Sequence, residues 1–149
     1  MGEWILNGLI AGAVAGIAQA IVAMVITFFT GHGLFWPLIN IGYMFRPAAD
    51  PPLDDDAGTI VKGLVIHVVV TALLGVLFAL IALVLADIGF IPLWLWGILY
   101  AVIIWAIDVL GLLRAIDPTM DRNFNYAIFL ISHLVYGAVL GWWLMTVAL

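Results

Sequence analysis

Three ionisable residues, His67, Asp108 and His133, each lie inside a long apolar stretch of the sequence. An ionisable side chain in such surroundings is costly, and it indicates a functional site unless a partner group satisfies it. A neutral imidazole can bind a metal ion through one ring nitrogen while its other nitrogen donates a hydrogen bond to a carboxylate. Two histidines and one aspartate are therefore a set that could hold a metal-containing cofactor or carry protons.

Glycines accompany both histidines. Gly63 precedes His67 by one helical turn, and Gly137 follows His133 by one turn. Two neutral imidazoles on facing helices could bind the iron of a b-type haem from both sides, and the glycines would leave space for the flat ring. His67 and His133 would then be the axial metal ligands, with Asp108 as the acceptor for one of their second nitrogens. One histidine with a small residue nearby, as in Gly63 and His67, would instead suit the magnesium of a chlorophyll-type pigment.

Two other interpretations of these residues stay open. The histidines and Asp108 could hydrogen-bond one another and fix the register of their helices, since buried polar groups are normally paired. Alternatively, Asp108 and a histidine could handle protons or a quinone, or serve a small transport protein.

The elements that position these residues follow from composition. The chain of 149 residues is 67% hydrophobic and only 9% charged, which is more apolar than a soluble domain of this size. Four apolar stretches, at about 5–29, 60–86, 91–113 and 126–149, are long enough to cross a bilayer as helices. The sequence therefore predicts an all-α fold with a single transmembrane domain over 1–149, an integral membrane up-down-up-down four-helix bundle.

Such a bundle places the three ionisable residues at one depth. The second and fourth predicted helices start at the same end, and the third helix ends there. His67 and His133 each lie seven residues into their helices, and Asp108 lies six residues before Arg114. At about 1.5 Å per residue, all three lie roughly 9–11 Å from that end. They are predicted to form a buried polar layer.

Residues 30–58 are predicted to be an interfacial loop at the same end. Its first part, 34–45, is rich in aromatic side chains, which favour the headgroup region of a membrane. The basic residues all belong to this end: Arg46, Lys62, Arg114 and Arg122. The positive-inside rule then predicts a cytoplasmic loop end and both termini outside the cytoplasm.

Small residues are spaced to let helices approach closely. The first helix carries a stripe of four: Gly8, Gly12, Gly16 and Ala20. Such a stripe serves packing within the bundle or the docking of another subunit. The step from His67 to Gly75 is the same as the step from His133 to Gly141. This suggests a weak internal repeat of two helical hairpins.

Three sequence features carry a family resemblance. They are the first-helix pattern Gly8-x-x-x-Gly12-x-x-x-Gly16, the histidine early in the second helix, and the last-helix segment His133-Leu-Val-Tyr136-Gly137-Ala-Val-Leu140-Gly141. Together they resemble a group of small four-helix prokaryotic membrane proteins. This group is loosely similar to the YagU-like inner-membrane proteins. The resemblance implies a fold and a location in the prokaryotic inner (cytoplasmic) membrane, but no activity.

Several functional classes are disfavoured. The absence of cysteine excludes disulfides and thiol chemistry, and the net charge of −5 argues against a nucleic-acid partner. The sequence has no nucleophile constellation or phosphate-binding loop, so a hydrolytic or transfer enzyme is not expected. We therefore predict a non-catalytic membrane subunit of a larger respiratory or photosynthetic electron-transfer complex. Its expected partners are the lipid bilayer and either other membrane subunits or further copies of the chain.

Overall fold

The computed structural model describes residues 2–85 and 91–148, and this part of the chain contains helices and no strands. The helices are α1 (Gly2–Phe29), α2 (Trp36–Gly42), α3 (Ala57–Leu85), α4 (Leu93–Ile107), the π-helical η2 (Asp108–Leu112), α5 (Leu113–Ile116), α6 (Pro118–Asn123) and α7 (Tyr126–Ala148). Four helical stretches are long and apolar enough to cross a membrane: Gly2–Phe29, Ala57–Val84, Leu93–Ile116 and Tyr126–Val147. This confirms the all-α class and the four long apolar helices. The predicted helix ends at 86 and 149 lie outside the described residues.

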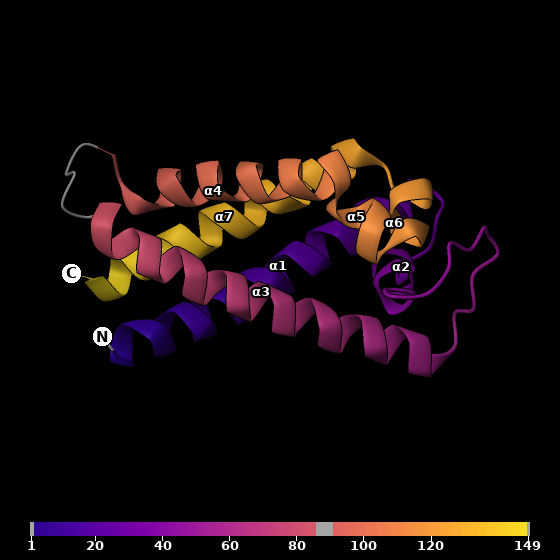
Figure 1. The fold of residues 1–149 in the computed structure, drawn as a ribbon, viewed down its shortest axis with the longest axis horizontal. Helices are drawn as coiled ribbons and strands as arrows, with labels where there is room; N and C mark the ends of the chain where they lie inside the picture. Colours follow the sequence, from indigo (N-terminus) through magenta and orange to yellow (C-terminus); the bar gives the residue numbers. More distant parts are fainter. Residues whose placement is uncertain (1, 86–90, 149) are drawn as a thin grey trace.

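The long helices lie side by side in the order α3, α1, α7, α4 (Figure 1). Helix α1 packs along both α3 and α7, and α4 packs along α7, whereas α3 and α4 contact each other only slightly. The two chain ends lie at the same end of the molecule, which we call the terminal end (Figure 1). Helices α2, α5 and α6 lie at the opposite end, the loop end.

Glycines bring each pair of packed helices into backbone contact. A Cβ atom on Gly12 of α1 would meet the Thr71 carbonyl oxygen and, at 2.8 Å, the Gly75 Cα atom of α3. A Cβ atom on Gly97 of α4 would meet the Gly137 carbonyl oxygen and the Gly141 nitrogen of α7 in the same way. Thr71 and Gly75 align with Gly137 and Gly141 at the offset that aligns the two histidines, so the predicted repeat corresponds to two hairpins with equivalent contacts.

The whole glycine stripe of α1 faces α3. Cβ atoms on Gly8 and Gly16 would also meet α3, at Ala79 and Thr71. The stripe therefore serves packing within the chain, and its alternative use as a docking surface for another subunit is excluded for these three glycines.

The two halves of the molecule are filled differently. At the terminal end, Phe78 of α3, Tyr100 of α4 and Tyr136, Leu140 and Leu144 of α7 form a continuous buried core. At the loop end, the helices are covered by α2 and α6 instead. Within the segment 34–45, which the sequence predicts to lie along the headgroups, α2 is buried against α3.

Glycines permit that burial. A Cβ atom on Gly63 would meet the Leu38 carbonyl oxygen of α2, and one on Gly42 would meet the Thr59 carbonyl oxygen of α3. The short helix α2 is therefore held by backbone contact with α3, which sequence periodicity does not reveal.

The third predicted helix is not continuous. Helix α4 ends at Ile107, and the next five residues form the π-helical turn η2, in which Gly111 departs from helical geometry. Beyond α5, the Asp117 side chain caps α6 by accepting a hydrogen bond from the Met120 backbone nitrogen at 3.1 Å. A π-helical turn inserts extra backbone into a helix and is frequently found at functional sites. Here it begins at Asp108.

Candidate functional site

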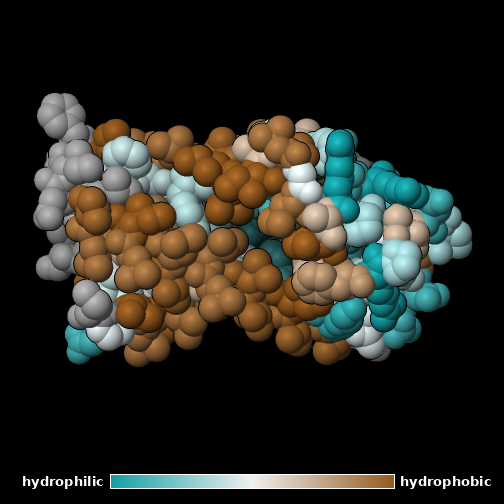
Figure 2. Space-filling view, viewed as in Figure 1, coloured by the Kyte–Doolittle hydropathy of each residue, from teal (hydrophilic) through white to brown (hydrophobic). Residues whose placement is uncertain are grey.

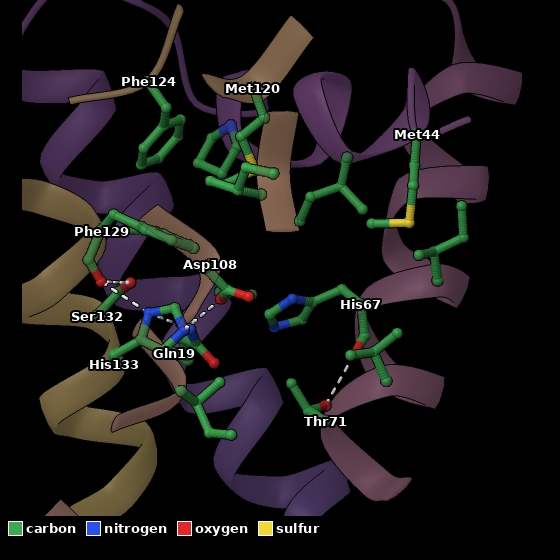
Figure 3. Close-up of a pocket in the computed structure, with 18 of the residues that line it drawn as sticks. Gln19, Met44, His67, Thr71, Asp108, Met120, Phe124, Phe129, Ser132 and His133 are labelled. Carbon is green, nitrogen blue, oxygen red and sulfur yellow. Dashed lines mark hydrogen bonds and ion pairs between the residues drawn. The ribbon is translucent and has the colours of Figure 1, made fainter. Parts of the chain in front are cut away.

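A cavity of about 290 Å³ lies in the loop half of the molecule, between α1, α3, α4 and α7. Leu38 and Ile41 of α2 and Met120 of α6 close it at the loop end, and Tyr136 lines it toward the terminal end. Most of its wall is apolar. The polar side chains that line it are Gln19, His67, Thr71, Asp108, Ser132 and His133 (Figure 3).

The cavity opens sideways between α3 and α4, the pair of long helices that scarcely touch. Val70 of α3 and Ile107 of α4 both line the cavity, yet they are 43% and 51% exposed, so they stand at its mouth. Figure 2 shows this mouth as a hollow in the largely hydrophobic face of the molecule, with hydrophilic residues at its bottom.

His133 is fixed by contacts to three elements. Its Nδ1 atom lies 2.8 Å from the Phe129 carbonyl oxygen and 3.1 Å from the Gln19 amide nitrogen of α1. Its Nε2 atom lies 3.5 Å from Oδ2 of Asp108. Because the Phe129 oxygen can only accept, the proton of that contact is on Nδ1. Nδ1 therefore cannot accept from the Gln19 amide nitrogen, and the Gln19 amide group meets it through its oxygen instead. Nε2 is the nitrogen that faces the carboxylate.

Asp108 lies at the start of the π-helical turn and lines the cavity. Its side chain is 16% exposed, and that of His133 is 7% exposed. The Oδ2 atom faces His133, whereas Oδ1 makes no hydrogen bond or ion pair within residues 2–85 and 91–148. The carboxylate therefore keeps one free acceptor atom in the cavity.

His67 approaches from the opposite wall (Figure 3). Its Nε2 atom lies 2.8 Å from the Gly16 carbonyl oxygen of α1, so Nε2 carries the proton and donates it. The other ring nitrogen, Nδ1, has no hydrogen-bond partner in the described part of the chain and keeps its lone pair. His67 thus joins α3 to α1 and presents a second acceptor atom to the cavity.

The structure therefore brings His67, Asp108 and His133 to one cavity. It does not bring Gly63 or Gly137 there. The position beside Gly63 is filled by α2, and the position beside Gly137 is filled by Gly97 and Ala101 of α4.

These contacts do not fit a tetrapyrrole. The glycines were expected to leave room for the ring, but helix backbone occupies both places. Both ring nitrogens of His133 face protein groups, and the nitrogen of His67 that points toward α1 is engaged by Gly16. The cavity is also at the lower limit of ligand pockets, which span roughly 300–1,000 Å³. An iron between the two imidazoles would require these contacts to be rebuilt. The ring of a magnesium pigment held by His67 alone would meet Leu38 of α2 beside Gly63.

Gln19 is the site residue that the sequence reasoning left out of the polar layer. Its side chain is 94% buried and meets His133 across the bundle. The available signal was its position, because it is the one side-chain amide in the central part of an otherwise apolar first helix. Ser132 also lines the cavity, but its hydroxyl donates to the Phe129 carbonyl oxygen of its own helix.

Comparisons of the chain with protein-family models, curated proteins and solved structures find no match.

Proposed function

We propose that this protein is an integral membrane four-helix bundle of up-down-up-down topology that binds a small lipophilic molecule with one polar end. The observation that carries this proposal is the cavity, which opens through an apolar face and has its polar groups inside. A molecule moving within the bilayer could enter between α3 and α4. Its apolar part would contact the cavity wall, and its polar end would reach His67, Asp108 and Gln19.

The outer surface supports placement in a membrane. Large apolar side chains are exposed along all four long helices, such as Leu6, Leu73, Ile103 and Trp142. Hydrophilic residues gather at the loop end (Figure 2). Exposed apolar surface of this extent is typical of lipid contact.

The orientation of the protein and the kind of membrane are inferred from the sequence. The basic residues lie toward the loop end, which favours a cytoplasmic loop end and both termini outside the cytoplasm. The family resemblance favours the prokaryotic inner membrane. A reporter fused after Leu149 that is active only outside the cytoplasm would agree with this orientation, and activity inside it would reverse the assignment.

Blocking the mouth tests the binding function. Val70 lines the cavity, while its neighbour Val69 is 52% exposed and does not. The Val70→Trp and Val69→Trp variants would be purified in mild detergent, and the small molecules they retain would be extracted and identified by mass spectrometry. We expect one lipophilic species to be enriched with the parent protein and with Val69→Trp, and depleted with Val70→Trp. Equal amounts in all three proteins, or no enriched species, would refute the proposal.

The role as a subunit of a larger electron-transfer complex, with other membrane subunits or further copies as partners, stays a prediction. The cavity is compatible with this role because quinone-class molecules, which carry electrons in membranes, are lipophilic molecules with a polar end.

A further inference from the structure

The proposed function leaves open which polar group the cavity recognises, and two of its atoms bear on this. They are Nδ1 of His67 and Oδ1 of Asp108, and both are hydrogen-bond acceptors. Neither has a hydrogen-bond partner in the described part of the chain. A bound molecule that only accepts hydrogen bonds would leave these atoms unsatisfied, which is costly in a buried site.

Apart from the Gln19 amide group, the donors around the cavity are already engaged. The hydroxyl of Thr71 donates to the His67 carbonyl oxygen at 2.9 Å, and that of Ser132 donates to the Phe129 carbonyl oxygen at 2.8 Å. The Tyr136 hydroxyl donates to the Thr71 carbonyl oxygen at 2.8 Å. The Nε2 proton of His67 is used by Gly16. The cavity thus offers free acceptors and few free donors.

We infer that the cavity selects a neutral lipophile that carries a hydroxyl group, which donates to His67 Nδ1 or Asp108 Oδ1. This inference rests on the proposed function and specifies its ligand. Phenols, hydroquinones and long-chain alcohols share this chemistry, whereas the oxidised quinone has only acceptor oxygens and is disfavoured.

A neutral donor suits the site better than an ammonium group. Asp108 already faces the His133 ring, whose Nε2 lies 3.5 Å from its Oδ2 atom. A cationic ligand would bring a further formal charge into an apolar bundle, which is costly.

The test compares matched probes bound to the full-length protein in detergent. The dissociation constants of para-pentylphenol and para-pentylanisole would be measured by native mass spectrometry. The anisole differs in having a methyl group on the oxygen, so it accepts but cannot donate. We expect the phenol to bind about tenfold more tightly, the effect of one hydrogen bond to a charged acceptor. Equal binding of the two probes would overturn the inference while leaving the cavity a binding site. If neither probe binds, the proposed function fails as well.

Variants assign the acceptor. Asp108→Leu should reduce the phenol-to-anisole preference several-fold, and Asp108→Asn, which keeps the side-chain shape, should reduce it less. The exposed Asp55 lies outside the cavity, so Asp55→Asn should keep the full preference. Because each variant is judged by the ratio of two affinities, general damage to the fold cancels. An unchanged ratio in both Asp108→Leu and His67→Leu would refute recognition by these acceptors.

Two aliphatic probes distinguish long-chain alcohols from aromatic hydroxyl compounds as the ligand, and they test whether the ligand is neutral or cationic. Binding of decan-1-ol as tight as that of the phenol would point to long-chain alcohols, and weaker binding would point to aromatic hydroxyls; either result agrees with the inference. Tighter binding of decylamine than of decan-1-ol would overturn the neutral-donor assignment.

Discussion

The hydroxyl of Tyr136 donates a hydrogen bond of 2.8 Å to the carbonyl oxygen of Thr71 and so connects α7 to α3 on the terminal side of the cavity. Tyr136 is 1% exposed. Tyr100 of α4 makes the equivalent contact one turn further along α3, to the Leu74 carbonyl oxygen at 2.9 Å. Two tyrosines from two helices thus fix α3 where the cavity ends and the packed core begins.

Removing the first of these hydroxyls should weaken the bundle. We expect Tyr136→Phe to lower the free energy of unfolding by about 0.5–1.5 kcal/mol, because the ring stays in place and one buried hydrogen bond is lost. Unfolding in mixed detergent would measure it. Tyr126→Phe is the matched control, since the Tyr126 hydroxyl bonds Asp121 at the exposed surface. Equal losses in the two variants would contradict the bracing role of Tyr136.

The glycine contact between α1 and α3 gives a second prediction. Gly12→Ala would place a methyl group against the backbone of Thr71 and Gly75, which cannot withdraw without separating the helices. We expect a loss of about 1–3 kcal/mol and a lower Tm. Gly2→Ala, on the same helix, has nothing within 4 Å of its new methyl group and should leave the Tm unchanged. If Gly12→Ala left the Tm and the free energy of unfolding unchanged, α1 and α3 would not be in backbone contact at Gly12.

These contacts indicate how much of the fold can be read from sequence. The four long helices follow from the length of the apolar runs, and the common depth of His67, Asp108 and His133 follows from the helical rise. The faces of the helices are harder to predict, because helices that are apolar all round carry little periodic signal. Gly63 and Gly137 were therefore assigned to a cofactor ring, although they serve contacts between helices.

The cavity itself depends on features without a local signal. The π-helical turn at Asp108 contains no proline that would announce an interruption. Helix α2 has seven residues, too few to be stable alone, and it exists because α3 covers it. Helix α2 depends on its contact with α3, which the sequence does not show.

Asp117 at the loop end gives a prediction about pH. Its side chain is fully buried, and this burial raises its pKa from 3.8 to about 6, although the Met120 hydrogen bond and the charge of Lys62 act in the opposite direction. Between these two pH values the folded state binds more protons than the unfolded state. The contribution of Asp117 to stability is therefore greatest below about pH 4, falls as the pH rises to about 6, and is constant above that.

Asp117→Asn removes this titration while keeping a side-chain oxygen that can cap α6. Relative to the variant, the parent protein should lose about 2–3 kcal/mol between about pH 4 and pH 6. Unfolding curves of both proteins across this range would measure the difference. A constant difference between them would mean that Asp117 has an ordinary pKa.

The last prediction concerns which histidine is the partner of Asp108. The carboxylate and the His133 ring face each other at 3.5 Å with little exposure, whereas the Nε2 proton of His67 is donated to Gly16. In a double-mutant cycle of Asp108→Leu with His133→Leu, the coupling energy should be about 1–3 kcal/mol, since removing either partner leaves the other buried without its contact. The cycle of Asp108→Leu with His67→Leu should give less than about 0.5 kcal/mol, as for residues that do not interact directly. Unfolding free energies of the single and double variants would measure both. The opposite order would mean that Asp108 turns to His67 across the cavity, and the free acceptor atoms assigned to the ligand would then bind each other through a shared proton.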